Sequence, residues 1–446
     1  MAVYEVNRIA DRAARAQFWE RTEDLKRRGD GEASRLVHMT ASVLSDSSEY
    51  VYSAIREEDD FAEGLRKQGK QVIKLSSGDP ALYFPTPKYI IDAYVEALVN
   101  GRTSYSRSQG VLELVNAVIE RYRSRYGLSM KEQDVVVTSG VAEALTFLNS
   151  ALMNAGDTAV ILKPYYPQYP VAIKMFGGDF LLGKYDESND WGIDLDALAK
   201  LIRRRRATSK RVKYLLMTNP NNPTGTVLPR QAVEEVVEMA NEHHILLVSD
   251  EIYDEIVFGG ASFTSVGELA KGVPHLILNG ASKAFDAPGF RIGYVLVPED
   301  DRVSEELKHK LADYCRVRLS ANTPAQYAIA SAMNNRMEHQ RTVGQMIKTI
   351  EGIVESAMKL LEENQYFSTV RPRGAFYIFP RIDMRSLEFK DDREFVHALL
   401  KEKLIQTTRG SGFGAPNHFR IVALAPRNVM SSCVEKINDF CREHSR

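Results

Sequence analysis

Four side chains lie in segments whose composition suits a catalytic site. Lys283 lies in NGASKAFDAPGFRIGY, directly after an apolar run. A free lysine has a pKa of about 10.4 and is protonated at neutral pH, but burial beside another cation would lower that pKa and allow a Schiff base. Asp250 and Tyr253 lie in SDEIYDEI, where the acid could bind a metal, cap a helix or pair with a cation. Asn222 lies in the Pro-rich turn TNPNNPTG, which would hold its amide rigidly toward a ligand. Taken singly, each also fits an ordinary structural role.

Two further segments could bind an anion and a ring. TSGVAEAL (138–145) has the pattern of a strand, a Gly turn and the start of a helix. The free N–H groups and the dipole of such a helix start make a cradle for phosphate. The aromatic segment PYYPQY (164–169) could stack a ring on a ligand, although aromatic clusters also pack in cores.

The apolar patterning predicts the elements that would position these residues. Short apolar runs alternate with amphipathic stretches such as 228–243, which is typical of an α/β protein with a mainly parallel central sheet. Ligand groups in such sheets gather at the carboxyl ends of the strands. The predicted strands of this sheet are 134–140, 158–164, 212–219, 244–251, 275–282 and 290–298, and two further strands, 375–381 and 418–425, follow long helical patterns.

The falling strand density after about residue 320 predicts more than one domain. We expect a helical or flexible N-terminal extension over residues 1–50, which is charged and shows no chemistry. We expect a large domain over 88–320 and a small domain built from both chain ends, 51–87 plus 321–446. The basic run over 200–213 is interpreted as a solvated helix end rather than a binding patch.

The composition excludes several function classes. Of 446 residues, 44% are hydrophobic and 26% charged, and 58 basic against 59 acidic side chains leave a net charge of −1. This balance lacks the basic excess of a dedicated nucleic-acid-binding protein. Three cysteines without a CxxC pair argue against a disulfide framework or a zinc ribbon, and we expect no metal site. Without a long apolar run or a secretory signal, the sequence predicts a cytoplasmic protein that does not bind membranes.

The order of the motifs along the chain is more specific than any one of them. A phosphate-binding turn, a stacking aromatic, a rigid Asn, an Asp-x-x-Tyr pair and a Ser-Lys follow one another, with Arg291 eight residues beyond Lys283. From about Val72 to the C-terminus, the sequence resembles the fold-type I, pyridoxal-phosphate-dependent aminotransferases of class I/II. The resemblance implies a mainly parallel sheet sandwiched by helices, a smaller α+β domain, bound pyridoxal 5′-phosphate, amino-acid and 2-oxo-acid substrates, and a homodimer with shared active sites.

The same resemblance implies a role for each matching residue. Lys283 corresponds to the lysine that binds the cofactor aldehyde and then moves a proton. Asp250 corresponds to the acid that pairs with the pyridinium nitrogen, and Asn222 and Tyr253 to donors toward the phenolate oxygen of the ring. The remaining correspondences are Tyr166 against the ring face; Gly140, Val141, Ala142, Ser282 and Arg291 around the phosphate; Tyr105 at the phosphate of the neighbouring subunit; and Arg420 and Gly78, with Asn222, at the substrate α-carboxylate.

One position departs from a common pattern of this family. Many relatives carry a hydroxyl residue three positions before the lysine, where this chain has Gly280. One phosphate contact would then be lost, so Ser282 and Arg291 would matter more. We do not interpret the glycine as inactivating.

Several segments are similar to the alanine-aminotransferase branch, among them YDESNDWGIDLDAL, RLSANTPAQYAI and PRGAFYIFPRID. No family-matched cation for a distal acidic side chain is found; Arg107 and Arg318 are candidates that also fit surface or structural roles. Tyr83 and Phe84 could line a small apolar pocket or pack in the core. The sequence therefore predicts alanine/pyruvate with glutamate/2-oxoglutarate as the substrate pair.

Other functions stay open at this point. An aspartate or aromatic aminotransferase would share the motifs, and so would a β-lyase or a decarboxylase that uses the same cofactor. A non-catalytic binding protein on this fold is disfavoured because the whole set of catalytic residues is retained. A pyridoxamine form produced by an amino acid alone would favour transamination.

Overall fold

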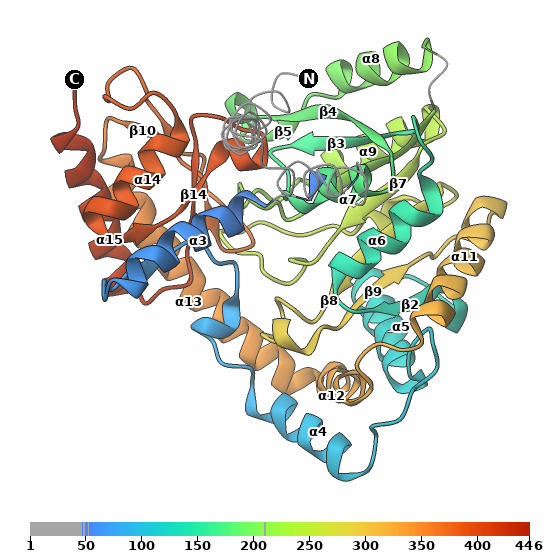
Figure 1. Cartoon of the computed structure of the whole chain (residues 1–446). Coiled ribbons are helices and arrows are strands. Elements are labelled where there is room, and N and C mark those ends of the chain that lie inside the picture. Colours follow the sequence, from blue (N-terminus) through green and yellow to red (C-terminus); the bar gives the residue numbers. More distant parts are fainter. Residues whose placement is uncertain (1–46, 48–49, 52, 209–210) are drawn as a thin grey trace, which may run out of the picture. The chain divides into compact units, whose positions relative to one another are not determined.

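The computed structural model describes Ser47, Tyr50, Val51 and the ranges 53–208 and 211–446 (Figure 1). Apart from Ser47 and Tyr50, the predicted N-terminal extension over residues 1–50 lies outside the described residues. The chain divides into two compact units, Met1–Tyr52 and Ser53–Arg446. All elements of the fold below belong to the second unit.

An eight-stranded sheet forms the centre of this unit (Figure 1). Its neighbouring strands β3 and β4, β3 and β6, β6 and β7, and β7 and β8 run parallel. Strand β9 is antiparallel to both β2 and β8, and β5 is antiparallel to β4. In spatial order the strands are β2 (Val135–Thr138), β9 (Gly293–Leu296), β8 (His275–Gly280), β7 (Leu246–Asp250), β6 (Val212–Thr218), β3 (Thr158–Lys163), β4 (Asp179–Asp186) and β5 (Gly192–Ile193).

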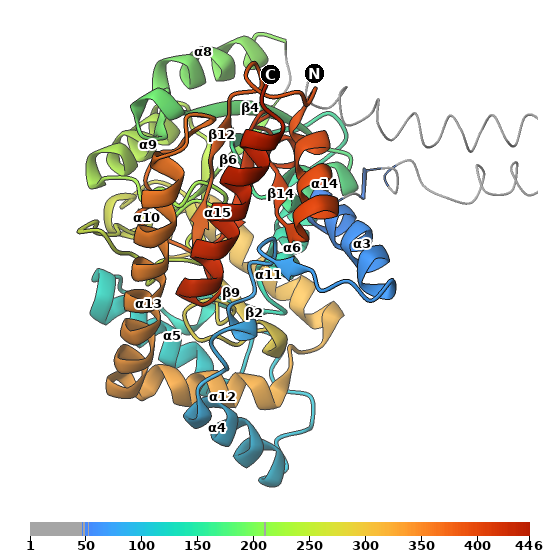
Figure 2. The same ribbon diagram turned by 90° about the vertical axis from the view of Figure 1, so that its left-hand side faces the viewer.

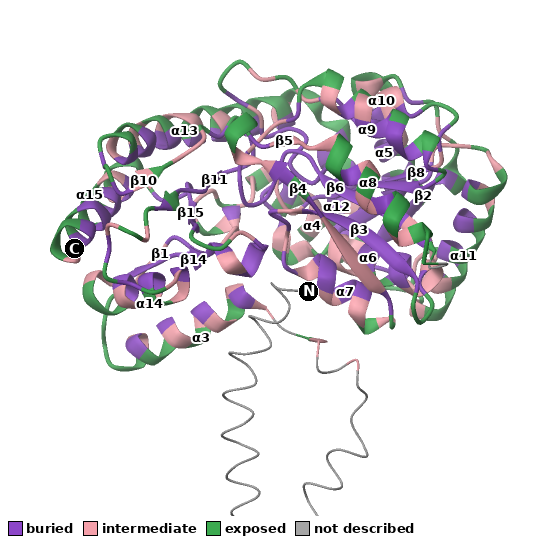
Figure 3. Ribbon diagram, turned by 90° about the horizontal axis from the view of Figure 1, so that it is seen from above, coloured by how far each residue is buried: buried purple, intermediate pink, exposed green. Residues whose placement is uncertain are grey.

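Helices cover both faces of the sheet because alternate residues of its central strands face opposite ways. In β6, Tyr214 and Leu216 belong to an apolar cluster on one face of the sheet, and Leu215 and Met217 belong to a second cluster on the opposite face. Each cluster includes residues of three helices. Figure 3 shows buried residues along these strands and exposed residues on the outer sides of the helices. The first face carries α6 (Val141–Leu152), α7 (Gln168–Met175) and α11 (Arg302–Arg318), and the second carries α8 (Leu195–Arg206), α9 (Arg230–Glu242) and α10 (Val266–Leu269).

A second group of elements joins the two ends of the described chain (Figures 1 and 2). Strand β1 (Ile73–Lys74) pairs in parallel with β13 (Ile405–Gln406), so an early segment meets a late one. Strand β15 (Phe419–Val422) pairs on one side with β11 (Tyr377–Ile378) and on the other with β14 (Thr408–Arg409). The remaining elements are the helices α3 (Ala54–Lys67), α4 (Lys88–Val99), α5 (Leu112–Tyr126), α12 (Thr323–Asn334), α13 (Arg336–Glu362), α14 (Asp392–Lys403) and α15 (Arg427–Glu443), and the pair β10 (Phe367–Ser368) and β12 (Arg381–Ile382).

The eight strands predicted from the sequence are confirmed, each with shortened ends, and so is the helix predicted over 228–243. Strand β4 was not predicted, because DFLLGKYD is only half-buried along most of its length and lacks a continuous apolar run. Across the described residues, every helix is too short or too polar to span a bilayer.

Candidate active site

The carboxyl ends of three adjacent parallel strands bring the predicted residues together. Thr218 ends β6 and is followed by the turn with Asn222, Asp250 ends β7, and Gly280 ends β8 three residues before Lys283. Because parallel strands end at the same edge of the sheet, side chains far apart in sequence meet there. This edge is the candidate active site.

The amine of Lys283 is desolvated and held in place. Its Nζ donates a hydrogen bond to the carbonyl oxygen of Gly78, 2.7 Å away, and lies 5.8 Å from the ring centre of Tyr253 and 5.7 Å from that of Phe376. Burial lowers the pKa of the Lys283 amine to about 8, although the nearby Asp79 carboxylate acts in the opposite direction. A substantial neutral fraction of the amine is therefore available near neutral pH.

Asp250 is a buried acid held by two donors. Its Oδ2 accepts from the Tyr169 hydroxyl at 2.7 Å, and its Oδ1 accepts from the backbone N–H of Ile252 at 3.2 Å. Burial raises the pKa of Asp250 to about 6, while these two hydrogen bonds and Lys283 favour the charged form. The carboxyl is accordingly mostly ionised at pH 7 and presents an anion to the site.

The Tyr169 hydroxyl also lies 2.7 Å from Oγ1 of Thr218. Tyr166, the predicted stacking aromatic, packs edge-on against Tyr169 with ring centres 5.6 Å apart. Tyr169 therefore connects the predicted aromatic to the acid on β7.

Arg420 lies on β15 and reaches the same edge of the large sheet. Its Nη1 donates to Oδ1 of Asn222 at 2.8 Å, and its Nη2 donates to the carbonyl oxygen of Ser76 at 2.6 Å. The guanidinium carbon lies 4.7 Å from the ring centres of both Tyr377 and Phe413. The rings and these acceptors hold a buried cation in one orientation, which suits bidentate binding of a carboxylate.

The hydroxyl of Tyr253 lies 2.6 Å from the hydroxyl of Tyr377. A Cβ added to Gly78 would lie 2.5 Å from that Tyr377 hydroxyl, so only glycine leaves room for it. Burial raises the pKa of Tyr377 to about 12 and that of Tyr253 well above its usual value. Both hydroxyls are therefore protonated donors at neutral pH.

The turn before α6 has the geometry of an anion cradle. Helix α6 begins at Val141, so the first N–H groups, including those of Val141 and Ala142, have no partners within the helix. Gly140 has φ of +79°, and a Cβ there would collide with the guanidinium of Arg291. Arg291 Nη2 donates to the carbonyl oxygen of Ser139 at 3.0 Å, which holds the cation beside the turn.

An ion pair fixes this helix start from outside. Glu143 Oε2 accepts from the backbone N–H of Ser139 and from Arg318 Nη1, each at 2.7 Å. Arg318 Nη2 donates to the carbonyl oxygens of Ser108 and Val137. Arg318 is thus a structural residue of the cradle.

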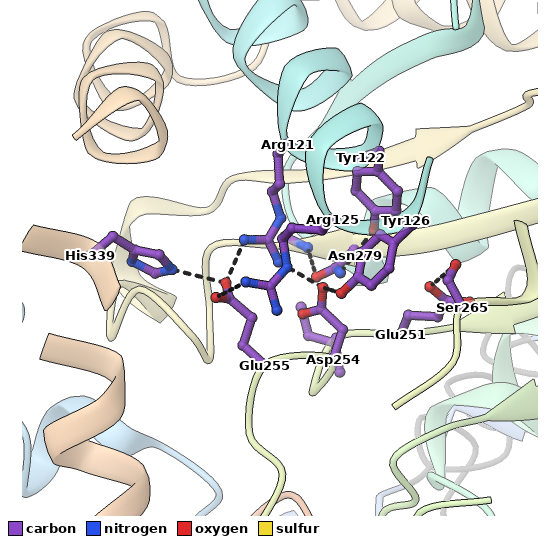
Figure 4. Close-up of polar contacts among 12 residues, drawn as sticks. Arg121, Tyr122, Arg125, Tyr126, Glu251, Asp254, Glu255, Ser265, Asn279 and His339 are labelled. Carbon is purple, nitrogen blue, oxygen red and sulfur yellow. Dashed lines mark hydrogen bonds and ion pairs between the residues drawn. The ribbon is translucent and has the colours of Figure 1, made fainter. Parts of the chain in front are cut away.

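The segment that carries Asp250 and Tyr253 is anchored from its other side (Figure 4). Glu251 accepts hydrogen bonds from the Ser265 hydroxyl at 2.8 Å and from the backbone N–H of Val266 at 2.9 Å. Burial raises the pKa of the Glu251 carboxyl to about 8. Because successive residues at the strand end point to opposite sides, Asp250 faces the site while Glu251 faces away from it.

A buried ionic cluster continues this anchor (Figure 4). Arg121 of α5 pairs with both Asp254 and Glu255, and Glu255 also contacts His339 of α13, Nε2 to Oε1 2.9 Å. Arg121 lowers the pKa of Glu255, which keeps this acid charged despite its burial. The cluster fixes the backbone directly after Tyr253.

Gly280, the departure from the family pattern, has a steric reason. A Cβ at this position would lie 2.6 Å from the carbonyl oxygen of Ile292 and 2.8 Å from Cα of Gly293. The antiparallel neighbour β9 approaches β8 too closely for any side chain here. A hydroxyl residue would displace β9.

The structure brings most predicted residues to this edge but not all. Tyr105 is 80% exposed in the loop after α4 and does not contribute to the enclosed part of the site described above. Ser282 is half-buried beside Lys283. Tyr169, Thr218 and Tyr377 were not predicted as site residues. All three lie within segments named above (PYYPQY, TNPNNPTG and PRGAFYIFPRID), but their positions along the chain gave no signal of their partners.

Comparison with known proteins identifies the family. A family model described as aminotransferase class I and II matches residues 70–437. The chain belongs to the class I and II aminotransferases. An aspartate aminotransferase of Bacillus subtilis is 31% identical over 390 residues, which cover 86% of this chain and 95% of that protein. An alanine aminotransferase of Mycobacterium tuberculosis is 32% identical, covering 84% and 87%.

Solved structures agree with this assignment. An alanine aminotransferase from Pyrococcus furiosus superposes with a TM-score of 0.85 at 34% identity, covering 90% of this chain and all of that one. The predicted fold, fold-type I, is confirmed, and the protein is a pyridoxal-phosphate-dependent aminotransferase that acts on amino acids and 2-oxo acids.

The chemistry of the residues at this edge of the sheet fits pyridoxal phosphate. A desolvated amine suits an aldehyde, a buried anion suits a protonated ring nitrogen, protonated hydroxyls suit a phenolate, and unpaired N–H groups beside a guanidinium suit a phosphate. The Gly140 turn, which a Cβ would fill, leaves the backbone accessible to an anion.

Proposed function

We propose that this aminotransferase moves an amino group between alanine and 2-oxoglutarate, giving pyruvate and glutamate. One observation supports alanine as one member of the pair: Arg318, a candidate for binding a distal carboxylate, is bound to Glu143 and two backbone carbonyls. Glutamate, which has a distal carboxylate, is proposed from the names of the relatives alone. Arg107, the other candidate, pairs with Glu132. Relatives named alanine aminotransferase and glutamate-pyruvate aminotransferase support the pair.

We assign the cofactor contacts as follows. Lys283 binds the aldehyde, Asp250 the ring nitrogen, and Asn222 and Tyr253 the ring oxygen. The carbonyl oxygen of Asn222 accepts from Arg420, which leaves its amide NH2 as the group to donate to a ligand. The remaining assignments are Tyr166 at the ring face and Gly140, Val141, Ala142, Ser282 and Arg291 at the phosphate.

When bound, pyridoxal phosphate supplies an electron sink for the charge left on the substrate α-carbon. The chain supplies positioning and proton transfer. Arg420 holds the α-carboxylate, with Asn222 and the backbone of Gly78 beside it, and so orients the α C–H bond. The amine of Lys283 takes the α-proton, and its pKa of about 8 leaves it able to act as a base near neutral pH. Ionised Asp250 keeps the ring nitrogen protonated.

We also propose a homodimer in which Tyr105 reaches the phosphate of the neighbouring subunit. Helix α4, just before Tyr105, exposes an apolar stripe at helical spacing, Ile91, Val95, Leu98 and Val99. Sedimentation of the wild type and of Val95→Glu would test it, and a monomeric active wild type would contradict it.

Two further expectations stay predictions. We propose that 88–320 form the large domain and that 51–87 plus 321–446 form the small one, which the β1–β13 pairing of early and late segments supports. Cytoplasmic location would be tested by cell fractionation.

Single-turnover absorbance of the holoenzyme tests the substrate. Alanine and glutamate should convert the bound cofactor to its amine form faster than aspartate or tyrosine at equal concentration, and pyruvate should restore it. Lys283→Ala serves as the matched control because it retains the pocket but lacks the base. Faster conversion by aspartate would contradict the proposed pair, and release of free ammonia or of CO2 would indicate a lyase or a decarboxylase.

A further inference from the structure

Tyr377 contacts three parts of the active site and has no role in the assignments above. Its hydroxyl is 2.6 Å from that of Tyr253 and lies against Cα of Gly78, and its ring lies under the guanidinium of Arg420. The ring is only 1% exposed. The residue is held there because β11 pairs with β15, the strand that carries Arg420.

The two hydroxyls cannot donate to each other at once, so their relative acidity decides the direction. The Arg420 guanidinium lies 4.7 Å from the Tyr377 ring centre, where a cation stabilises developing negative charge on the phenol oxygen. This contact between the Arg420 guanidinium and the ring favours Tyr377 as the donor of the pair.

We propose that Tyr377 is a positioning residue that donates its hydroxyl proton to the oxygen of Tyr253, so that the proton of Tyr253 is directed at the ring oxygen of the cofactor. This inference rests on the proposed role of Tyr253. Chains of hydrogen bonds polarise one another, so a donor behind Tyr253 strengthens the bond in front of it. The ring oxygen is thereby held in its anionic form.

The pH titration of the visible absorbance of the holoenzyme measures this effect. A weaker donor at the ring oxygen makes the chromophore bind its proton more tightly, which raises its apparent pKa. Tyr377→Phe should raise that pKa by about half a pH unit, and Tyr253→Phe by about one unit or more. The double variant should match Tyr253→Phe, because without Tyr253 the donor behind it has nothing to act on.

Tyr214→Phe is the matched control. It removes a buried tyrosine hydroxyl that is bonded to Asn149 at 2.7 Å within the core. A role limited to folding predicts that Tyr377→Phe and Tyr214→Phe both lower the melting temperature and leave the chromophore pKa unchanged. In contrast, 3-fluorotyrosine at position 377 keeps the shape and makes the hydroxyl more acidic, so the chromophore pKa should fall. This second variant carries the test if Tyr377→Phe does not fold.

The outcomes separate the two proposals. A shift with Tyr253→Phe but none with Tyr377→Phe or with the fluorotyrosine would overturn the role of Tyr377 alone. Additive shifts in the double variant would also overturn it, because Tyr377 would then act without Tyr253. If Tyr253→Phe leaves the chromophore unchanged, the assigned role of Tyr253 is wrong and the inference falls with it.

Discussion

The lowered pKa of Lys283 predicts how the apoenzyme captures pyridoxal phosphate as a function of pH. Only the neutral amine attacks an aldehyde. Burial lowers the pKa from 10.5 to about 8. At pH 7, about one tenth of such an amine is neutral, against about three in ten thousand for an ordinary lysine, a difference of roughly 300-fold.

The perturbation is therefore a change of pH, and the readout is the rate of appearance of the bound chromophore after rapid mixing of apoenzyme with the cofactor. Because the amine loses its proton as pH rises, the rate should climb about tenfold per unit below pH 7.5 and become flat above about pH 9. N-acetyl-lysine methyl ester, mixed with the same cofactor, provides the unperturbed comparison. Its rate should still be climbing at pH 9.5.

A rate for the protein that keeps climbing tenfold per unit up to pH 10 would refute the reasoning, because the amine would then behave as if solvated. Asp79→Asn sharpens the test. Among the charges near Lys283, Asp79 most strongly favours the protonated amine. Its loss should therefore move the midpoint of the curve of capture rate against pH below that of the wild type. A midpoint that moves upward would contradict the charge arrangement around Lys283.

Three further substitutions test the framework of the site. Arg121→Leu leaves buried Asp254 without its ion-pair partner, while Glu255 keeps Arg125 and His339, and should lower the free energy of unfolding by about 3 kcal/mol in urea titrations. Exposed Arg123→Leu on the same helix should leave it unchanged within error. Gly280→Ser should lower the free energy of unfolding by about 1–3 kcal/mol, because the new side chain overpacks against β9. Gly344→Ala lies on the exposed side of α13 and meets no atom within 4 Å, so it should raise the free energy of unfolding by about 0.5–1 kcal/mol. Arg420→Lys removes bidentate geometry and should raise KM for alanine about tenfold to a hundredfold in steady-state assays; an unchanged KM would count against carboxylate binding there.

Much of the sheet could be predicted because it depends on local patterning. The runs that became β3, β6, β7 and β8 are mostly apolar, since both of their faces are buried under helices. Strand β4 was missed because its side chains are only half-buried, so it has no such run. Local sequence patterns therefore reveal strands that are buried on both faces and miss strands that are only partly buried.

The candidate site divides in the same way. Lys283, Asp250 and Asn222 stood out because each follows a strand end within a distinctive segment, and strand ends converge in a parallel sheet. Tyr377 could not be recognised, because its function depends on the pairing of β11 with β15 and on the hydroxyl of a residue 124 positions away. Arg318 could be named as a cation from its residue type, yet only the fold decided that Glu143 binds it.

The sequence by itself determined most strands of the central sheet and the order of the motifs, because these are properties of residue types and short-range periodicity. The amine, the acid and the guanidinium were assigned because that order resembles the class I and II aminotransferases. The tertiary structure alone decided that the hydroxyl of Tyr377 lies next to that of Tyr253, that no side chain fits at Gly280, and how strongly burial lowers the pKa of Lys283. These results depend on the distances between segments that are far apart in the chain, which the order of residues does not set. Burial and charge act over these distances.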